Sequence, residues 1–294
     1  EAAEADEKYL EYDGELGIYY VYLLHNIHFQ MYGAFFSGQY EHAIRAAREM
    51  EAIVRPEYLL SDHPFLVNYL EAFYGMKAHV LIRFGKWQEI LDEPLPQDPE
   101  LFCVTHAVWQ YAKGIAHAVL GNIDDAMAQQ RLLREAVSNL PKDRIVFQND
   151  TRDILAVAGP MLAGELDYRL GEYDSAFRNL RKAVKLYDNL NYSEPWSWMM
   201  PPRHALGALL LEQGHVEEAA SVYRADLGLD DTLVRPSQHR NNIWALVGYA
   251  ECCERLDDQK TLDAIQPELE MAQRIADDTI DVSCFCRIGH ECCE

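Results

Sequence analysis

The chain has 294 residues, 49% of them hydrophobic, so it is long enough to bury a large core. Its formal net charge of −22 argues against nucleic acids and anionic membranes as partners, because binding to either requires clustered Lys and Arg. The sequence also contains no apolar run near the roughly 20 residues of a membrane span and opens with no secretory signal pattern, so we expect no membrane partner.

Residues 1–18 form an acidic first segment, in which seven of the first 16 residues are carboxylates. The stretch "EAAEADEKYL" is typical of the middle of a helix. We therefore expect a helix that continues from a missing region, and the acidity of both ends of the chain predicts solvated, partly frayed termini.

Residues 19–250 contain a repeated pattern centred on five glycines. Two residues after each glycine is a bulky side chain, and five residues after it is an apolar one, usually Ala. A small residue precedes four of the glycines by seven positions. This pattern predicts helix–turn–helix units in which the glycine ends the first helix in a left-handed conformation and the small residue lets the two helices approach closely. The glycines are Gly38, Gly85, Gly121, Gly171 and Gly214.

Three copies, "KGIAHAVLGNIDDAM", "AGELDYRLGEYDSAF" and "LGALLLEQGHVEEAA", show that the chain resembles the tetratricopeptide repeat family over roughly residues 20–250. The glycines are 47, 36, 50 and 43 residues apart, which departs from the regular repeat of 34. "HNIHF", "IRFGKWQEIL" and "NNIWALVGYA" are similar to large repeat proteins related to tetratricopeptide repeat protein 38, whose C-terminal half this chain would be. The resemblance implies an all-α, right-handed solenoid of about 12–14 antiparallel helices.

Proline-rich stretches are predicted to interrupt the repeat at residues 92–100, 139–150 and 192–207. The last of these contains Trp196 and Trp198, and a proline at 201 or 202 suits the first turn of a helix. Its Arg203 has two interpretations. It could bind an anion or carboxylate, or the segment could be an apolar bridge between units in which Arg203 pairs with a local acid such as Glu194.

The family resemblance also implies which side chains face a concave ligand-binding groove. We expect His204 to lie too far from His25 and His28 to join them unless the array curls tightly. In these positions the side chains would contact a peptide or partner protein, or would simply form the wall of the groove. The predicted groove residues are His25, His28, Tyr32, His79, Tyr111, Glu165, Arg203 and His204.

Two clusters could hold a metal ion. His25 and His28 share one helical face, although metal sites normally need three or four ligands. In "CFCRIGHECCE", Cys284, Cys286 and His290 are the candidate ligands, but their spacing is not that of paired zinc knuckles. Free or oxidisable thiols are the alternative there, and no cofactor is predicted.

Residues 251–294 are expected to form a degenerate capping repeat and a Cys-rich acidic tail. Seven clustered cysteines, an odd number, favour a reducing cytoplasm over a disulfide-stapled secreted domain. No nucleotide-binding, nucleophile-elbow or zinc-protease motif is present. The sequence therefore favours a non-enzymatic protein-interaction or scaffold module. The alternatives are a metal- or small-molecule-binding, possibly enzymatic, solenoid and a purely structural spacer.

Overall fold

The computed structural model describes residues 2–13, 19–54, 56–60, 64–277 and 279–287. These residues form an all-α protein that includes one short β-hairpin, whose two strands have two residues each. The elements are α1 (Ala2–Asp13), α2 (Tyr19–Phe36), α3 (Tyr40–Ile53), α4 (Pro56–Leu59), α5 (Pro64–Tyr74), α6 (Met76–Arg83), α7 (Trp87–Asp92), α8 (Cys103–Val119), α9 (Ile123–Asn139), β1 (Ile145–Val146), β2 (Asn149–Asp150), α10 (Thr151–Arg169), α11 (Tyr173–Asp188), α12 (Pro202–Glu212), α13 (Val216–Leu227), η1 (Arg235–Ser237), α14 (Ile243–Arg255) and α15 (Gln259–Ile275).

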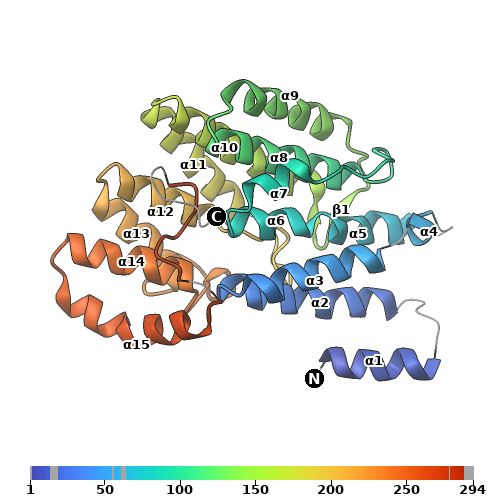
Figure 1. Cartoon of the computed structure of the whole chain (residues 1–294), viewed down its shortest axis with the longest axis horizontal. Helices are drawn as coiled ribbons and strands as arrows, with labels where there is room; N and C mark the ends of the chain where they lie inside the picture. Colours follow the sequence, from blue (N-terminus) through green and yellow to red (C-terminus); the bar gives the residue numbers. More distant parts are fainter. Residues whose placement is uncertain (1, 14–18, 55, 61–63, 278, 288–294) are drawn as a thin grey trace.

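Consecutive helices pack as pairs, and each pair packs against the next. The pairs are α2/α3, α6/α7, α8/α9, α10/α11, α12/α13 and α14/α15 (Figure 1). The first helix of the second pair is broken at Gly75 into α5 and α6. None of the helices in the described ranges is both long enough and apolar enough to cross a membrane.

The predicted turns are confirmed. All five repeat glycines have positive φ, between 65° and 79°. The apolar residues five positions later are fully buried against the preceding helix; they are Ala43, Ile90, Ala126, Ala176 and Ala219.

The predicted small positions also permit close helix packing. A Cβ on Gly114 would lie 2.7 Å from Leu162, and one on Gly164 would lie 2.8 Å from Leu180. Real Cβ atoms do not approach other atoms so closely, so a larger residue here would require the leucine side chains or the helices to shift.

The sixth pair, α14/α15, uses a different turn residue. Asp257 occupies the position of the turn glycine, with φ of 55°, and Asp258 caps α15 by accepting from Thr261 N at 3.1 Å. Ala250 precedes Asp257 by seven residues and thus takes the small position of this unit. Gly248, in contrast, packs against Tyr223 of the preceding helix.

Replacing Asp257 with glycine should raise the free energy of unfolding by about 0.5–1 kcal/mol, because glycine adopts positive φ without the steric cost of a Cβ. Urea denaturation would measure the change. Gly214→Asp is the matched reverse substitution at an equivalent turn and should destabilise the protein. A destabilising Asp257→Gly would show that the Asp257 side chain contributes more than its backbone conformation costs.

The three proline-rich interruptions are confirmed as breaks between helices, except that the third ends at residue 201 and not at 207. α7 ends at Asp92, the β1–β2 hairpin follows α9, and a crossover segment of residues 191–201 joins α11 to α12. Pro202 is the first residue of α12, where a missing N–H costs no helical hydrogen bond.

The first and last helix pairs lie against each other, so the array closes on itself (Figure 1). Trp244 Nε1 on α14 donates a hydrogen bond to the carbonyl of Phe35 on α2 at 2.9 Å. Asp277 N, just after α15, donates to the carbonyl of Gly38 at 3.1 Å. The helix pairs therefore curl tightly enough to bring both ends of the array together.

Residues 279–287 run back into the interior after α15. The expectation of a solvated tail is wrong for this stretch, because Ile280, Ser283, Cys284 and Cys286 are each less than 5% exposed. Arginines anchor the segment, with Arg83 donating to the carbonyl of Ser283 and Arg169 donating to that of Cys286. The tail is ordered because it fills space that the curled helix pairs enclose.

Candidate functional site

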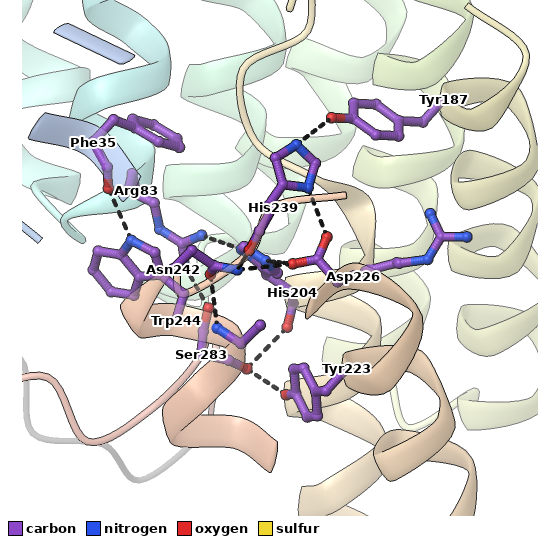
Figure 2. Close-up of polar contacts among 12 residues, drawn as sticks. Phe35, Arg83, Tyr187, His204, Tyr223, Asp226, His239, Asn242, Trp244 and Ser283 are labelled. Atoms are coloured by element: carbon purple, nitrogen blue, oxygen red, sulfur yellow. Dashed lines mark hydrogen bonds and ion pairs between the residues drawn. The ribbon is translucent and has the colours of Figure 1, made fainter. Parts of the chain in front are cut away.

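A buried polar network surrounds Asp226, near the C-terminal end of α13 (Figure 2). Its carboxylate is 0% exposed and accepts three hydrogen bonds. The donors are His204 Nε2 at 2.9 Å, His239 Nδ1 at 2.9 Å and Asn242 Nδ2 at 3.1 Å. Together with Arg83, these four residues are called the Asp226 cluster below.

His204, on α12, is a neutral imidazole in a defined tautomer. Arg83 Nη1 lies 2.8 Å from His204 Nδ1, and because a guanidinium has only donors, Nδ1 must accept. The ring proton is therefore on Nε2, where it is donated to Asp226. Complete burial lowers the pKa of His204 to about 4, and the neighbouring Arg83 cation acts in the same direction.

The charge on Asp226 is stabilised by its donors. Its burial favours the protonated form, but the two histidines outweigh this and hold the carboxyl pKa below its ordinary value. His239 continues the network, because its Nε2 lies 3.3 Å from the Tyr187 hydroxyl and its ring stacks on Phe36 with centroids 4.8 Å apart. The carboxylate therefore remains ionised without contact with water.

Arg83 supplies the positive charge of the cluster and connects it to α14 and to the C-terminal segment. Its guanidinium lies 3.8 Å from the ring centroid of Trp244, and it donates to the carbonyl of Ser283. The Ser283 hydroxyl in turn bonds to Tyr223 and to the carbonyl of His204. Burial lowers the pKa of Arg83 to about 9, which still leaves it charged at neutral pH.

The arrangement is a buried carboxylate held by hydrogen-bond donors, and the Arg83 cation is linked to it through His204. Paired His and Asp side chains are also the components of general acid–base catalysis, but such groups must reach a substrate. Asp226 and His204 are 0% exposed, and their hydrogen-bonding atoms are directed at one another. The cluster joins α6, α12, α13, the loop before α14 and the C-terminal segment. Its role is therefore to hold these elements in position relative to one another.

Three predicted groove residues surround the crossover segment. His28 Nε2 lies 3.2 Å from the Met199 sulfur, and the rings of His79 and Tyr111 have centroids 4.9 and 5.1 Å from that of Trp198. All five side chains are buried. The predicted inner face is thus covered at these positions by the crossover segment, which is neither helix nor strand.

Burial determines the protonation of these two histidines. It lowers the pKa of His28 to about 3 and that of His79 to about 4, so both are neutral at physiological pH. His28 Nδ1 has no hydrogen-bond partner among the described residues. No hydrogen bond within the described residues therefore compensates for the burial of this nitrogen.

The structure separates His25 from His28. His25 is half-buried, its ring contacts Phe29 with centroids 4.8 Å apart, and its Nδ1 lies 3.3 Å from the Asn26 side chain. Tyr32 is half-buried and packs on Phe36 with centroids 4.7 Å apart. Although the two histidines share a helical face, their side chains therefore lie in different environments.

The remaining predicted residues form ion pairs. Glu165 is buried and pairs with Arg169 at 2.6 Å. Arg203 binds Asp188 through two hydrogen bonds of 2.5 and 2.7 Å. Arg203 therefore pairs with a local acid, but this acid is Asp188 at the end of α11 and not Glu194, which accepts from the Tyr192 hydroxyl.

The predicted metal ligands can be placed only in part. Within the ranges that the structure describes, no three His, Cys, Asp or Glu side chains are grouped to hold a metal ion. Cys284 and Cys286 are joined by a disulfide. His290, together with Cys292 and Cys293, lies outside the described residues.

A surface pocket of about 620 Å³ lies beside the N-terminal part of α8 and is lined by Cys103, His106 and Glu135 among others. Burial raises the pKa of the Cys103 thiol to about 11. His106 Nε2 lies 2.8 Å from the carbonyl of Pro96. The thiol is thus protonated at neutral pH, which is unfavourable for a nucleophile.

Sequence reasoning missed Asp226, His239, Asn242 and Arg83. Only Asn242 carried a readable signal, because an Asn before an apolar run is a typical helix N-cap, and its side chain does accept from Ala245 N at 2.9 Å. Comparison with known proteins adds no family, since no protein-family model matches the chain and no curated protein matches it either.

Proposed function

We propose that the chain is a tetratricopeptide-like solenoid that acts as a non-enzymatic protein-interaction module, with an inner face that holds an extended peptide. The supporting observation is the contact between predicted ligand positions and the crossover segment. His28, His79 and Tyr111 contact Met199 and Trp198 through sulfur and ring interactions. An extended peptide from a partner would use the same types of contact.

The crossover segment resembles a bound peptide in its hydrogen bonds as well. Asn149, at the β2 strand, bonds at both ends of its amide to Asn191, with Nδ2 donating to the Asn191 carbonyl at 3.0 Å and Oδ1 accepting from Asn191 N at 2.7 Å. Ser197 Oγ donates to the carbonyl of Val146 at 3.0 Å. Main-chain and side-chain contacts of this kind fix an extended segment in register.

A partner that uses this face must displace the crossover segment. Trp198 and Met199 are 0% exposed, so the segment now occupies the inner face completely at these positions. The proposal therefore predicts low affinity for peptides in the native chain and higher affinity once the segment's anchoring side chains are removed.

The test is a fluorescently labelled peptide with the sequence NYSEPWSWMMP, residues 191–201, added to a variant carrying Trp198→Ala and Met199→Ala. We expect the variant to bind the peptide at least tenfold more tightly than the native chain does, measured by fluorescence anisotropy. Met199→Ala alone provides a milder variant should the double substitution prevent folding, which circular dichroism would reveal.

The matched control peptide has alanine in place of both tryptophans and both methionines. If a folded variant binds the two peptides equally, or binds neither, the inner face does not recognise peptides and the proposal fails.

A further inference from the structure

A groove between α9, α10 and α11 has the features of a second binding surface, separate from the inner face. It has a volume of about 420 Å³, with α9 and α11 as its walls and α10 as its floor. The floor consists of small apolar residues, namely Ala156, Gly159, Pro160 and Ala163. A Cβ built on Gly159 meets no atom within 4 Å, so the floor is open there.

Both walls of this groove, called the α9–α11 groove below, carry positive charge. Arg134 lines it from α9 and Lys182 lines it from α11. Arg131 lies three residues before Arg134 on the same helical face, and Arg178 and Lys185 flank Lys182 in the same way. All five side chains are exposed.

These cations have no acidic partner within ion-pair distance in the described part of the chain. The protein has 48 acidic and 26 basic residues, so a group of exposed cations without ion-paired carboxylates differs in charge from the chain as a whole. Arg181, on another face of α11, does pair with Glu218 at 2.7 Å. The groove is therefore a local basic surface on an acidic protein.

The floor also contains a backbone carbonyl that lacks its usual helical donor. In α10, the carbonyl of Ala156 would ordinarily accept from the backbone N–H of residue 160. Residue 160 is proline, which has no N–H, and both residues line the groove. A ligand that carries a hydrogen-bond donor can satisfy this carbonyl.

We propose that the α9–α11 groove binds an extended acidic peptide segment of a partner protein. Successive side chains of an extended segment point in opposite directions, so adjacent carboxylates would reach Arg134 on one wall and Lys182 on the other. The backbone N–H groups of an extended segment are free to bond to the carbonyl of Ala156, whereas those of a helix are not. The proposal extends the interaction role to a surface separate from the inner face.

The first test is fluorescence anisotropy with the labelled peptide GAEEDEEAG. We expect binding that weakens as salt rises, and at least a tenfold loss of affinity in an Arg134→Glu/Lys182→Glu variant. Lys142→Glu/Lys260→Glu changes the net charge equally at two exposed lysines elsewhere and should keep the affinity. Equal losses in the two variants, or no binding by the native chain, would overturn the proposal.

Gly159→Leu gives a test that blocks the groove with little effect on folding. Leucine has a higher helix propensity than glycine and meets open space at this position, which offsets the crowding of its Cβ against Pro160, so the melting temperature should change little. The leucine side chain would nevertheless fill the floor of the groove and should weaken peptide binding at least tenfold. Unchanged affinity in this variant would show that the peptide binds elsewhere.

A single-stranded RNA of the same charge tests the other class of polyanion. If it binds more tightly than the acidic peptide and depends equally on Arg134 and Lys182, the assignment to a peptide is wrong. None of these variants alters the crossover segment, so failure here and failure of the inner-face proposal are distinguishable.

Discussion

Replacing Asp226 with alanine is expected to lower the free energy of unfolding by about 3–5 kcal/mol, because it leaves a buried cation without a compensating charge. The substitution would leave the buried Arg83 guanidinium without a nearby anion. It would also leave His204, His239 and Asn242 with donors that lack their acceptor. A domain of ordinary stability has only about 5–15 kcal/mol in total, so this single change should bring the chain close to unfolding.

Urea denaturation followed by circular dichroism would measure this loss. Asp231→Ala removes an exposed carboxylate five residues away and should change the free energy of unfolding by no more than about 0.5 kcal/mol. Asp226→Asn preserves the shape of the side chain but not its charge, and separates the two contributions. A loss below about 1 kcal/mol in Asp226→Ala would show that the cluster contributes little to stability.

Replacing His28 with leucine is expected to make the chain less sensitive to acid. Burial lowers the pKa of His28 from 6.5 to about 3, so between these values the unfolded chain binds a proton that the folded chain does not. The native protein therefore loses stability as the pH falls below about 6.5. At pH 5, about 1.5 units below the pKa of the unfolded state, proton binding by the unfolded chain costs the native protein roughly 2 kcal/mol of stability. The leucine variant would not lose this stability.

The measurement compares the free energy of unfolding of both proteins at pH 7.5 and at pH 5. At pH 7.5 the two should agree within about 1 kcal/mol, because leucine is similar in size and the site is lined by Phe73, Phe147 and Met199. At pH 5 the variant should be the more stable one. His42→Gln, at an exposed histidine, is the control. An identical stability difference at both pH values would mean that His28 does not titrate as described.

The helix pairs were predictable because their signals are local. A turn that needs positive φ selects glycine, and the close contact seven residues earlier selects a small residue, so both recur in the sequence. The sixth turn escaped this reasoning because Asp257 replaces the glycine. Aspartate tolerates the left-handed conformation better than most residues, so the backbone is the same while the sequence signal is lost.

The candidate site was not predictable, because its partners are distant along the chain. Arg83 and His204 are 121 residues apart, and Asp226 bonds to residues 13, 16 and 22 positions away with no common period. The contacts of the predicted groove residues were unpredictable for a related reason. No local pattern reveals that His28 and His79 lie against the crossover segment.

The closure of the helix array has a consequence for how the chain folds during synthesis. Open arrays of repeats can fold pair by pair as they emerge, because each pair contacts only its neighbours. Here the carbonyl of Phe35 receives its hydrogen bond from a residue 209 positions later. At a translation rate of 5–20 residues per second, α2 waits roughly 10–40 s for Trp244, with part of its apolar surface uncovered. The N-terminal pairs are therefore the part of the nascent chain that most needs protection from aggregation.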